Sequence, residues 1–312
     1  MSRMHHNRRC HSRQHDLRRR LDRTRGEQME DPAQVVRPIL ITPFRFNEER
    51  PMSTVQSSAP AKVVSRDEWL AARRQLLIEE KKLTHQQDKL SAARREMPWV
   101  RIDKDYVFET AEGQVRLTDL FEGRSQLLIK HFMLSAGKDV CVGCSFELDH
   151  IEGALVHLEH HDVTFVAVAR APLAQILAAK ERMGWRCKWV SSYSSDFNYD
   201  FNISFRPEDI ARGEVFYNFA MQSIPMEDLS GISVFYKDAN GDIFHTYSAF
   251  GRGAENVLTT YMLLDLTPKG RNETGPHYHL TDWVRPHDRY DAKGAVDATG
   301  QFVAEGACGC PQ

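Results

Sequence analysis

The pattern of hydrophobic and polar positions first predicts a long helix that begins near Ser65. Residues 1–60 show no hydrophobic period and end in the stretch SSAPA, which is typical of a tail and linker. Ser65 is followed three residues later by Glu68, a capping-box signature, and the helical pattern ends before Pro98. Its apolar stripe recurs every seven residues, at Trp69, Leu76, Leu83, Leu90 and Met97. A single stripe favours a helix lying on its own domain, with a coiled coil as the alternative.

After Asp105 the pattern predicts strands alternating with helices. The segments YVFE and QVRL flank AEG and predict a hairpin, and the continuous apolar run QLLIKHFM predicts a buried parallel strand. A helix follows over about Ser145 to His161, and then a second buried strand over 163–169. Pro172 and Gly184 mark the start and the end of the next helix.

The last part of this pattern predicts an antiparallel hairpin and a closing helix. ISVFYKD and DIFHTYSAF face each other across Ala239, Asn240 and Gly241, and the closing helix is AENVLTTYMLLDL. This element order predicts an α/β protein with a thioredoxin-like fold, extended by the N-terminal long helix and hairpin and by peroxiredoxin-like additions. We expect this domain to cover residues 61–290, after a disordered basic tail and linker over 1–60, and we expect 291–312 to be a flexible tail.

Composition and charge narrow the class of protein. The 312 residues are 41% hydrophobic, and Lys130 and Arg170 interrupt the longest apolar runs, so no membrane span is expected. Residues 1–25 hold nine Arg against two Asp. Such an arm can bind nucleic acid, an anionic membrane or a targeting receptor, but a disordered tail, or a start upstream of the true initiator at Met29 or Met52, is the favoured interpretation. Without an apolar segment typical of a secretory signal, the six cysteines predict intracellular thiols in a cytoplasmic protein.

The candidate chemistry is a CxxC pair, Cys141 and Cys144, between a buried strand and a helix. Unpaired N–H groups and the dipole at a helix N-terminus favour a thiolate, so we expect Cys141 to be the nucleophile. Cys144, one turn later, is then expected to resolve the mixed disulfide. Two alternatives stay open: a pair of unreactive packed cysteines, and a zinc site completed by His150 or by the distant Cys308 and Cys310.

Two further residues are candidates for supporting roles. His131 interrupts the apolar strand ten residues before Cys141, where it can tune the thiolate or shuttle a proton, or can be a satisfied core histidine. Arg170 ends the next strand at the same expected edge of the sheet, where it can favour an anionic thiolate or substrate, or can be solvated. His157 and His161 lie four residues apart, but without a Glu in an HExxH arrangement a solvated polar face is favoured.

With these motifs in place, the chain resembles a thioredoxin-like family of unknown function that is labelled as predicted dithiol-disulfide oxidoreductases. The resemblance covers about Val63 to Tyr290. The segments that carry it are VVSRDEWLAAR, EMPWVRIDKDYVF, LTDLFEGRSQLLIKHFM, CVGCSFELDHIEGAL, VTFVAVARAPL, RMGWRCKWVSSYSSDFNYDF, GISVFYKDANGDIFHTYSAFGRG, LLDLTPKGR and WVRPHDRY. The resemblance implies the fold and a dithiol activity.

The resemblance also bears on partners and on one more site residue. Gly231, Ile232 and Ser233 stand where a thioredoxin has the cis-proline that faces its cysteines, which makes Ser233 a supporting candidate. Peroxidase chemistry is disfavoured, because Lys138 stands where a peroxiredoxin carries a hydroxyl residue. We expect no cofactor and no metal, a disulfide-containing protein or a small thiol as substrate, and neither nucleic acid nor membrane as partner. A non-enzymatic interaction or metal-binding module is the alternative function.

Overall fold

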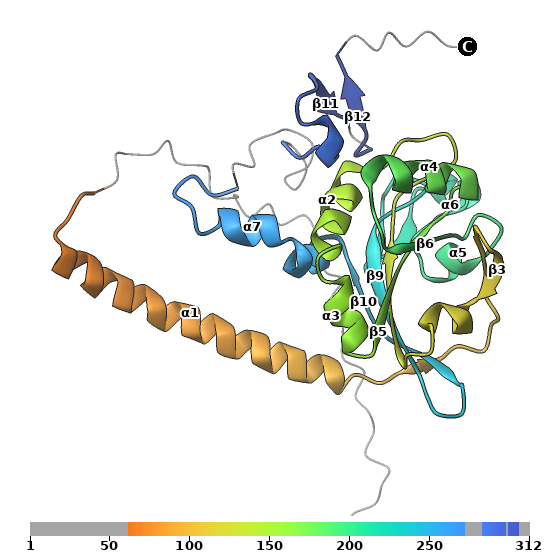
Figure 1. The fold of residues 1–312 in the computed structure, drawn as a ribbon, viewed down its shortest axis with the longest axis horizontal. Helices are drawn as coiled ribbons and strands as arrows, with labels where there is room; N and C mark the ends of the chain where they lie inside the picture. Colours follow the sequence, from red (N-terminus) through yellow and green to blue (C-terminus); the bar gives the residue numbers. More distant parts are fainter. Residues whose placement is uncertain (1–61, 272–282, 298, 306–312) are drawn as a thin grey trace, which may run out of the picture. The chain divides into compact units, whose positions relative to one another are not determined.

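An eight-stranded sheet forms the centre of the fold (Figure 1). The structure, a computed structural model, describes residues 62–271, 283–297 and 299–305. The strands are β1 (Val100–Arg101), β2 (Val107–Thr110), β3 (Gly113–Arg116), β4 (Gln126–His131), β5 (Val163–Ala169), β6 (Lys188–Ser191), β7 (Val215–Tyr217), β8 (Ala220–Gln222), β9 (Gly231–Lys237), β10 (Ile243–Phe250), β11 (Gly294–Val296) and β12 (Phe302–Ala304). The α-helices are α1 (Arg66–Arg95), α2 (Val142–Ile151), α3 (Leu155–His160), α4 (Leu173–Met183), α5 (Phe197–Asp200), α6 (Pro207–Ala211) and α7 (Thr259–Leu264), and the 3₁₀ helices are η1 (Leu117–Phe121), η2 (Gly251–Val257) and η3 (His287–Arg289).

The order of the strands makes the fold thioredoxin-like. The sheet runs β1-β10-β9-β4-β5-β6-β2-β3. β4, β5 and β6 are parallel and are joined by helices, whereas β9 is antiparallel to β4 and β10 is antiparallel to β9. Parallel strands beside an antiparallel hairpin, with the CxxC at the start of the helix that follows β4, form the thioredoxin-like unit. The predicted α/β fold with an N-terminal helix and hairpin is therefore confirmed.

Local sequence signals account for several of these elements. Ser65 and Glu68 form the predicted capping box, in which the Ser65 hydroxyl accepts from the Glu68 amide and the Glu68 carboxylate accepts from the Ser65 amide. Gly184 ends α4 with φ at 65°, a left-handed conformation that glycine adopts without strain. The β9–β10 turn contains Gly241 with φ at 90°.

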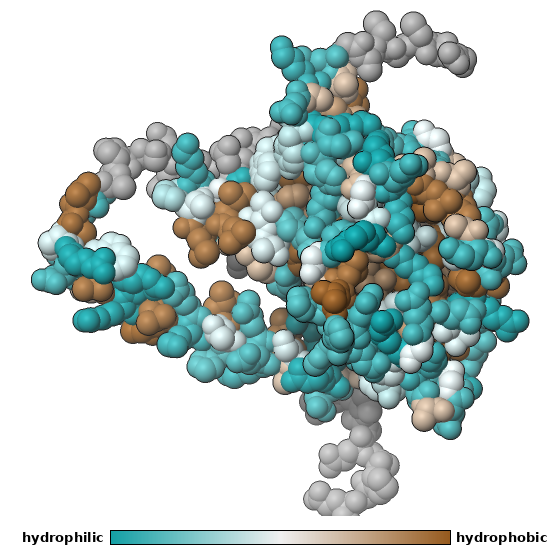
Figure 2. Space-filling model, in the orientation of Figure 1, coloured by the Kyte–Doolittle hydropathy of each residue, from teal (hydrophilic) through white to brown (hydrophobic). Residues whose placement is uncertain are grey.

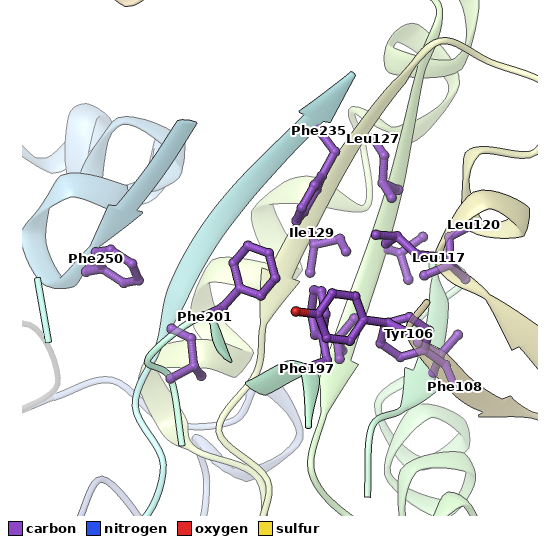
Figure 3. Packing of buried hydrophobic residues seen from close by; sticks show 14 of the residues in the cluster. Tyr106, Phe108, Leu117, Leu120, Leu127, Ile129, Phe197, Phe201, Phe235 and Phe250 are labelled. Carbon is purple, nitrogen blue, oxygen red and sulfur yellow. The ribbon is translucent and has the colours of Figure 1, made fainter. Parts of the chain in front are cut away.

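Two hydrophobic clusters lie on the two faces of the sheet. The first cluster includes Leu127 and Ile129 of β4, Phe197 of α5 and the following Phe201, and Figure 3 shows how these side chains converge. The second cluster packs α2 and α4 against the other face, where Phe132, Phe165 and Trp189 contribute large side chains. Because side chains alternate along a strand, each residue of β4 faces one cluster or the other.

Several elements differ from the predictions. The helix expected over Ser145 to His161 begins three residues earlier and divides into α2 and α3, since Ala154 N–H bonds to Ile151 O in a tight turn next to Gly153, a poor helix former. The predicted closing helix is interrupted at Leu258, whose ψ of 74° is not helical and whose side chain is buried. Strands β6, β7 and β8 were not predicted.

The apolar stripe of α1 is exposed. Its five residues, Trp69, Leu76, Leu83, Leu90 and Met97, are between 45% and 59% exposed, and no residue of α1 is buried. Hydrophobic side chains are correspondingly visible along α1 in Figure 2. The helix therefore does not bury its stripe on its own domain as expected. Leucine every seventh residue, with Glu79 and Gln86 between, gives too narrow an apolar face to require burial.

The C-terminal region also differs from its prediction. Residues 294–296 and 302–304 pair as the hairpin β11–β12 instead of a flexible tail, and Phe302 of this hairpin is buried in a cluster with Val142 and Phe146 of α2. The basic arm over 1–60 and the tail cysteines Cys308 and Cys310 lie outside the described residues. None of the described helices combines the length and the apolar character needed to cross a membrane.

The contrast between the central sheet and α1 gives a stability prediction. Ile129→Ala should lower the free energy of unfolding by about 2 to 5 kcal/mol, because the fully buried side chain leaves a cavity. Leu83→Ala should change it by no more than about 0.5 kcal/mol. Urea denaturation of both variants tests this. A comparable loss in Leu83→Ala would mean that the stripe of α1 is covered in solution.

Candidate active site

The two cysteines of the CxxC lie at the start of α2, on the face that packs on the sheet. Cys141 is the N-cap residue, with an extended backbone, and Cys144 lies one turn later. Cys141 is 6% exposed and Cys144 is 1% exposed, so both thiols are buried. The Met133 N–H points at Cys144 Sγ at 3.4 Å, and Cys141 N–H at the Met133 carbonyl at 3.4 Å. The chain that leaves β4 thus holds both cysteines in place.

A buried ion pair lies beneath the cysteines. Lys130 of β4 is fully buried, and its Nζ donates to a carboxylate oxygen of Glu147 and to Ser230 Oγ, the latter at 2.6 Å. Glu147 and Cys144 are three residues apart on α2, so they share one helix face. The other Glu147 oxygen, Oε1, is buried and has no hydrogen-bond partner within the described part of the chain. Burial alone would lower the pKa of Lys130, but the charges of Glu147 and the cysteines raise it, so Lys130 is a cation at neutral pH.

The surroundings of the two thiols shift their pKa values in opposite directions. Burial opposes ionisation of Cys144, but the hydrogen bond from the Cys141 thiol and the charge of Lys130 prevail and lower the pKa of Cys144 to about 6. The same hydrogen bond, followed by burial, raises the pKa of Cys141 well above its ordinary value. In the reduced pair, Cys144 is therefore the thiol that ionises more readily. This differs from the expected thiolate on Cys141: the amides of Gly143 and Cys144 do favour ionisation there, but they are outweighed.

The loop between β4 and α2 is held by a side chain of α4. The Gln175 amide donates to the carbonyls of Ser135 and Lys138 at 3.0 and 2.6 Å, and its oxygen accepts from Gly137 N–H at 3.1 Å. Arg182 of the same helix pairs with Asp139 at 3.0 Å. These contacts fix the position of the cysteines relative to the sheet.

The hairpin β11–β12 covers Cys141. The Val142 N–H donates to the Gly300 carbonyl at 3.0 Å, and the turn of the hairpin passes so close that a Cβ added at Gly300 would lie 3.4 Å from Cys141 Sγ. Figure 1 shows this hairpin near one end of α2. The turn of the hairpin therefore packs directly against the Cys141 thiol.

His131 and Ser233 lie on the other face of the sheet. Successive residues of a strand point to opposite faces, so His131 points away from the α2 side on which Lys130 lies. His131 Nε2 pairs with Ser233 Oγ at 2.8 Å, and its ring stacks on Phe197 at 5.6 Å. Burial, the charge of Lys130 and His245 lower the pKa of His131 to about 3. The structure thus places His131 and Ser233 together in the first cluster, without contact to the cysteines.

Arg170 lies beside the site and contacts neither cysteine. Its Nε donates to Asp228 at 3.3 Å, and its guanidinium lies over the Tyr199 ring at 5.3 Å from the centroid. Asp228, itself buried, also accepts hydrogen bonds from the hydroxyls of Ser135 and Ser204. Arg170 therefore helps to anchor the loop that precedes the CxxC.

The remaining candidates are placed apart from the dithiol. His150 Nδ1 donates to the Phe146 carbonyl at 2.5 Å, and its Nε2 accepts from the Thr260 N–H at 3.0 Å and pairs with Thr260 Oγ1 at 2.7 Å. Cys187 is buried, and burial raises its pKa, which makes it unreactive at neutral pH. Among the described residues, no group of three or more His, Cys, Asp or Glu side chains is arranged to hold a metal ion.

Lys130, Glu147, Ser230 and Gly300 were not singled out from the sequence. A signal existed for one of them, because a lysine within the buried run QLLIKHFM requires a carboxylate partner inside the protein. Which carboxylate it would find depends on the rotation of α2, which the sequence does not show.

Comparison with protein families gives one match. Residues 58–290 match the model of a family described as "Bacterial protein of unknown function (DUF899)". No curated protein matches the chain.

Among solved structures, the chain is similar to two peroxiredoxins at low identity. Peroxidoxin BcpB from Mycobacterium tuberculosis is 12% identical, with a TM-score of 0.36 over 53% of this chain and 95% of that one. Peroxiredoxin Q from Xanthomonas campestris is 13% identical, with a TM-score of 0.35 over 49% of this chain and 87% of that one.

The ion pair beneath Cys144 gives a prediction about its ionisation. In the reduced protein, one thiolate should form with a pKa of about 6, so it is present above that pH and lost below it. Lys130→Met should raise this pKa by about one unit or more, because the cation is removed. Glu147→Gln should lower it further, because a nearby negative charge is removed. Thiolate ultraviolet absorbance as a function of pH measures all three.

Lys138→Met is the matched control for these variants. Lys138 is an exposed lysine in the loop before Cys141, so its removal should leave the titration unchanged. Shifts of the same sign in Lys130→Met and Glu147→Gln would contradict the assignment of the thiolate to Cys144.

Proposed function

The chain belongs to the DUF899 family of bacterial proteins of unknown function, and we propose that it is a thiol–disulfide oxidoreductase that uses Cys141 and Cys144. The observation that carries the proposal is that two adjacent buried thiols lie beside the buried Lys130–Glu147 ion pair, whose cation lowers the pKa of Cys144. A thiolate is the reactive species in disulfide exchange. The buried Lys130 ammonium is costly in free energy, and it stabilises such a thiolate.

Exchange begins with Cys141, the more exposed thiol at the helix N-cap. As Cys141 attacks one sulfur of a substrate disulfide, its proton passes along the existing hydrogen bond to the Cys144 thiolate. A bond forms between Cys141 Sγ and that sulfur, the substrate disulfide breaks, and the other substrate sulfur leaves as a thiolate. The amides of Gly143 and Cys144 favour the charge that develops on Cys141 Sγ during the transfer.

Resolution requires Cys144 to lose the proton it has gained. Glu147 is placed to accept it, because it shares a helix face with Cys144 and its Oε1 has no hydrogen-bond partner among the described residues. Lys130 holds the other Glu147 oxygen and favours the re-formed thiolate. Cys144 then attacks Cys141 Sγ, the Cys141–Cys144 disulfide forms, and the second substrate sulfur is released. The reverse sequence oxidises a dithiol substrate.

The proposal predicts a reversible disulfide between Cys141 and Cys144. Titration with oxidised and reduced dithiothreitol or glutathione, read by mass spectrometry, should show this disulfide forming at a potential between roughly −350 and −120 mV. Cys187 should stay reduced throughout, because it is buried and its pKa is raised. A pair that never forms the disulfide in this range would end the proposal and favour a metal-binding or interaction module.

Only one of the two single-cysteine variants should form a stable mixed disulfide with a substrate. Cys144→Ser should attack a disulfide substrate and stall as a mixed disulfide on Cys141, which a reducing agent releases. Cys141→Ser should form no such adduct, because Cys144 is 1% exposed.

The proposed role of Glu147 gives a separate kinetic prediction. Glu147→Gln should slow resolution by about 100-fold, within the range typical of a lost general base, so that the mixed disulfide accumulates. The initial attack by Cys141 should not slow. Rapid acid quenching followed by mass spectrometry separates the two steps. Glu159→Gln, which removes an exposed glutamate of α3, is the control. Equal rates of resolution in Glu147→Gln and the control would exclude Glu147 as the proton acceptor.

A further inference from the structure

The hairpin β11–β12 packs against the dithiol as a bound polypeptide would. Its Gly300 carbonyl accepts from the Val142 N–H at 3.0 Å, the first amide of α2. A Cβ at Gly300 would lie 3.4 Å from Cys141 Sγ. In a disulfide, the Cβ of one cysteine lies about 3 Å from the sulfur of the other, as the bond lengths require. Gly300 therefore stands close to where a cysteine linked to Cys141 would stand.

The side chain of Phe302 holds the hairpin in a hydrophobic cluster. Phe302, two residues after Gly300, is 7% exposed and packs in a cluster with Val142, Phe146, Leu258, Tyr261 and Val284. The guanidinium of Arg285 lies over the Phe302 ring at 5.3 Å from the centroid. The cluster thus takes an aromatic side chain two residues after the position that approaches Cys141.

The carboxylate of Asp297 organises the turn of the hairpin through hydrogen bonds. Asp297 Oδ1 accepts from Thr299 N–H, Thr299 Oγ1 and Gln301 N–H at 2.8 to 3.0 Å, and the Asp297 carbonyl accepts from Gly300 N–H at 3.0 Å. These bonds hold the Gly300 carbonyl toward α2 without any help from the dithiol.

We propose that the hairpin is an internal pseudosubstrate that occupies the subsite for a polypeptide substrate. Gly300 takes the place of the substrate's cysteine, and Phe302 takes the place of an aromatic residue two positions later. The substrate class is therefore a protein disulfide with the pattern cysteine, any residue, aromatic residue, whose main-chain carbonyl accepts from Val142 N–H. Because glycine has no sulfur, the hairpin closes the site without reacting, and a substrate must displace it.

This inference rests on the proposed function and adds only the identity of the substrate. In the displaced state the substrate cysteine sulfur bonds to Cys141 Sγ, the substrate disulfide breaks, and its second sulfur leaves as a thiolate. The proton of Cys141 goes to Cys144 as before. No reactant besides the substrate disulfide is needed.

The first experiment places a cysteine in the subsite. In a Cys144→Ser background, Gly300→Cys should form a disulfide with Cys141 when oxidised dithiothreitol is added, which is itself reduced to the dithiol. Peptide mapping by mass spectrometry detects the product. Thr299→Cys in the same background is the matched control, because Thr299 is exposed and its side chain bonds to Asp297. Equal yields in the two variants would overturn the placement of the subsite.

The second experiment tests the substrate pattern without changing Gly300, where φ is 81° and a side chain is strained. Two peptides, Cys-Gln-Phe and Cys-Gln-Ala with the same flanking residues, are each joined through the cysteine to thionitrobenzoate. The wild-type protein should release thionitrobenzoate from the Phe peptide about tenfold faster, since burial of the ring favours binding. Equal rates would overturn the aromatic preference.

Variants of the hairpin complete the test. Phe302→Ala should increase the rate with both peptides, because the hairpin then dissociates from α2 more readily. Val303→Ala is the control and should leave the rate unchanged, because the Val303 side chain is 48% exposed. An unchanged rate in Phe302→Ala would mean that the hairpin does not compete with substrate. If the proposed function itself fails, neither peptide reacts with the wild-type protein although the Cys141 to Gly300→Cys disulfide still forms.

Discussion

The burial of the Lys130 ammonium is the constraint on which the rest of the site depends. An ion removed from water costs several kcal/mol unless a partner compensates it. Lys130 lies on β4 between β5 and β9 and cannot move to solvent, so a carboxylate must come to it. Glu147 fulfils this requirement, and the rotation of α2 is thereby fixed. Cys144, three residues earlier on the same helix face, is brought under the influence of the same cation.

The parts of this arrangement that are local could be predicted from the sequence. The buried strands, the β9–β10 hairpin and the capping box of α1 each follow from a pattern within a few residues. The position of the CxxC at the start of a helix follows likewise. The choice of supporting residues could not be made in this way. His131 and Lys130 are neighbours in sequence, yet a step of one residue along a strand changes the face of the sheet. Only the three-dimensional structure shows which of these two residues points toward α2.

The C-terminal hairpin illustrates a different limit of sequence patterns. Residues 294–304 are mostly small or polar, so they lack the period of a strand packed on a core. Their position depends on two contacts with α2, the Val142 to Gly300 hydrogen bond and the insertion of Phe302. Both join segments about 160 residues apart, and a long-range contact of this kind leaves no local periodic signal.

The closed hairpin and the buried ion pair support each other. A thiol pair open to solvent at neutral pH is exposed to oxidation, and the turn of the hairpin packs against Cys141 of this pair. Exclusion of water also strengthens the attraction between Lys130 and Cys144. When the hairpin leaves, water weakens that attraction, and the Val142 N–H loses the Gly300 carbonyl as its acceptor. Both changes favour movement of the negative charge from Cys144 towards Cys141 at the helix start. In the proposed exchange reaction, the nucleophile is therefore activated at the moment when a substrate can reach it.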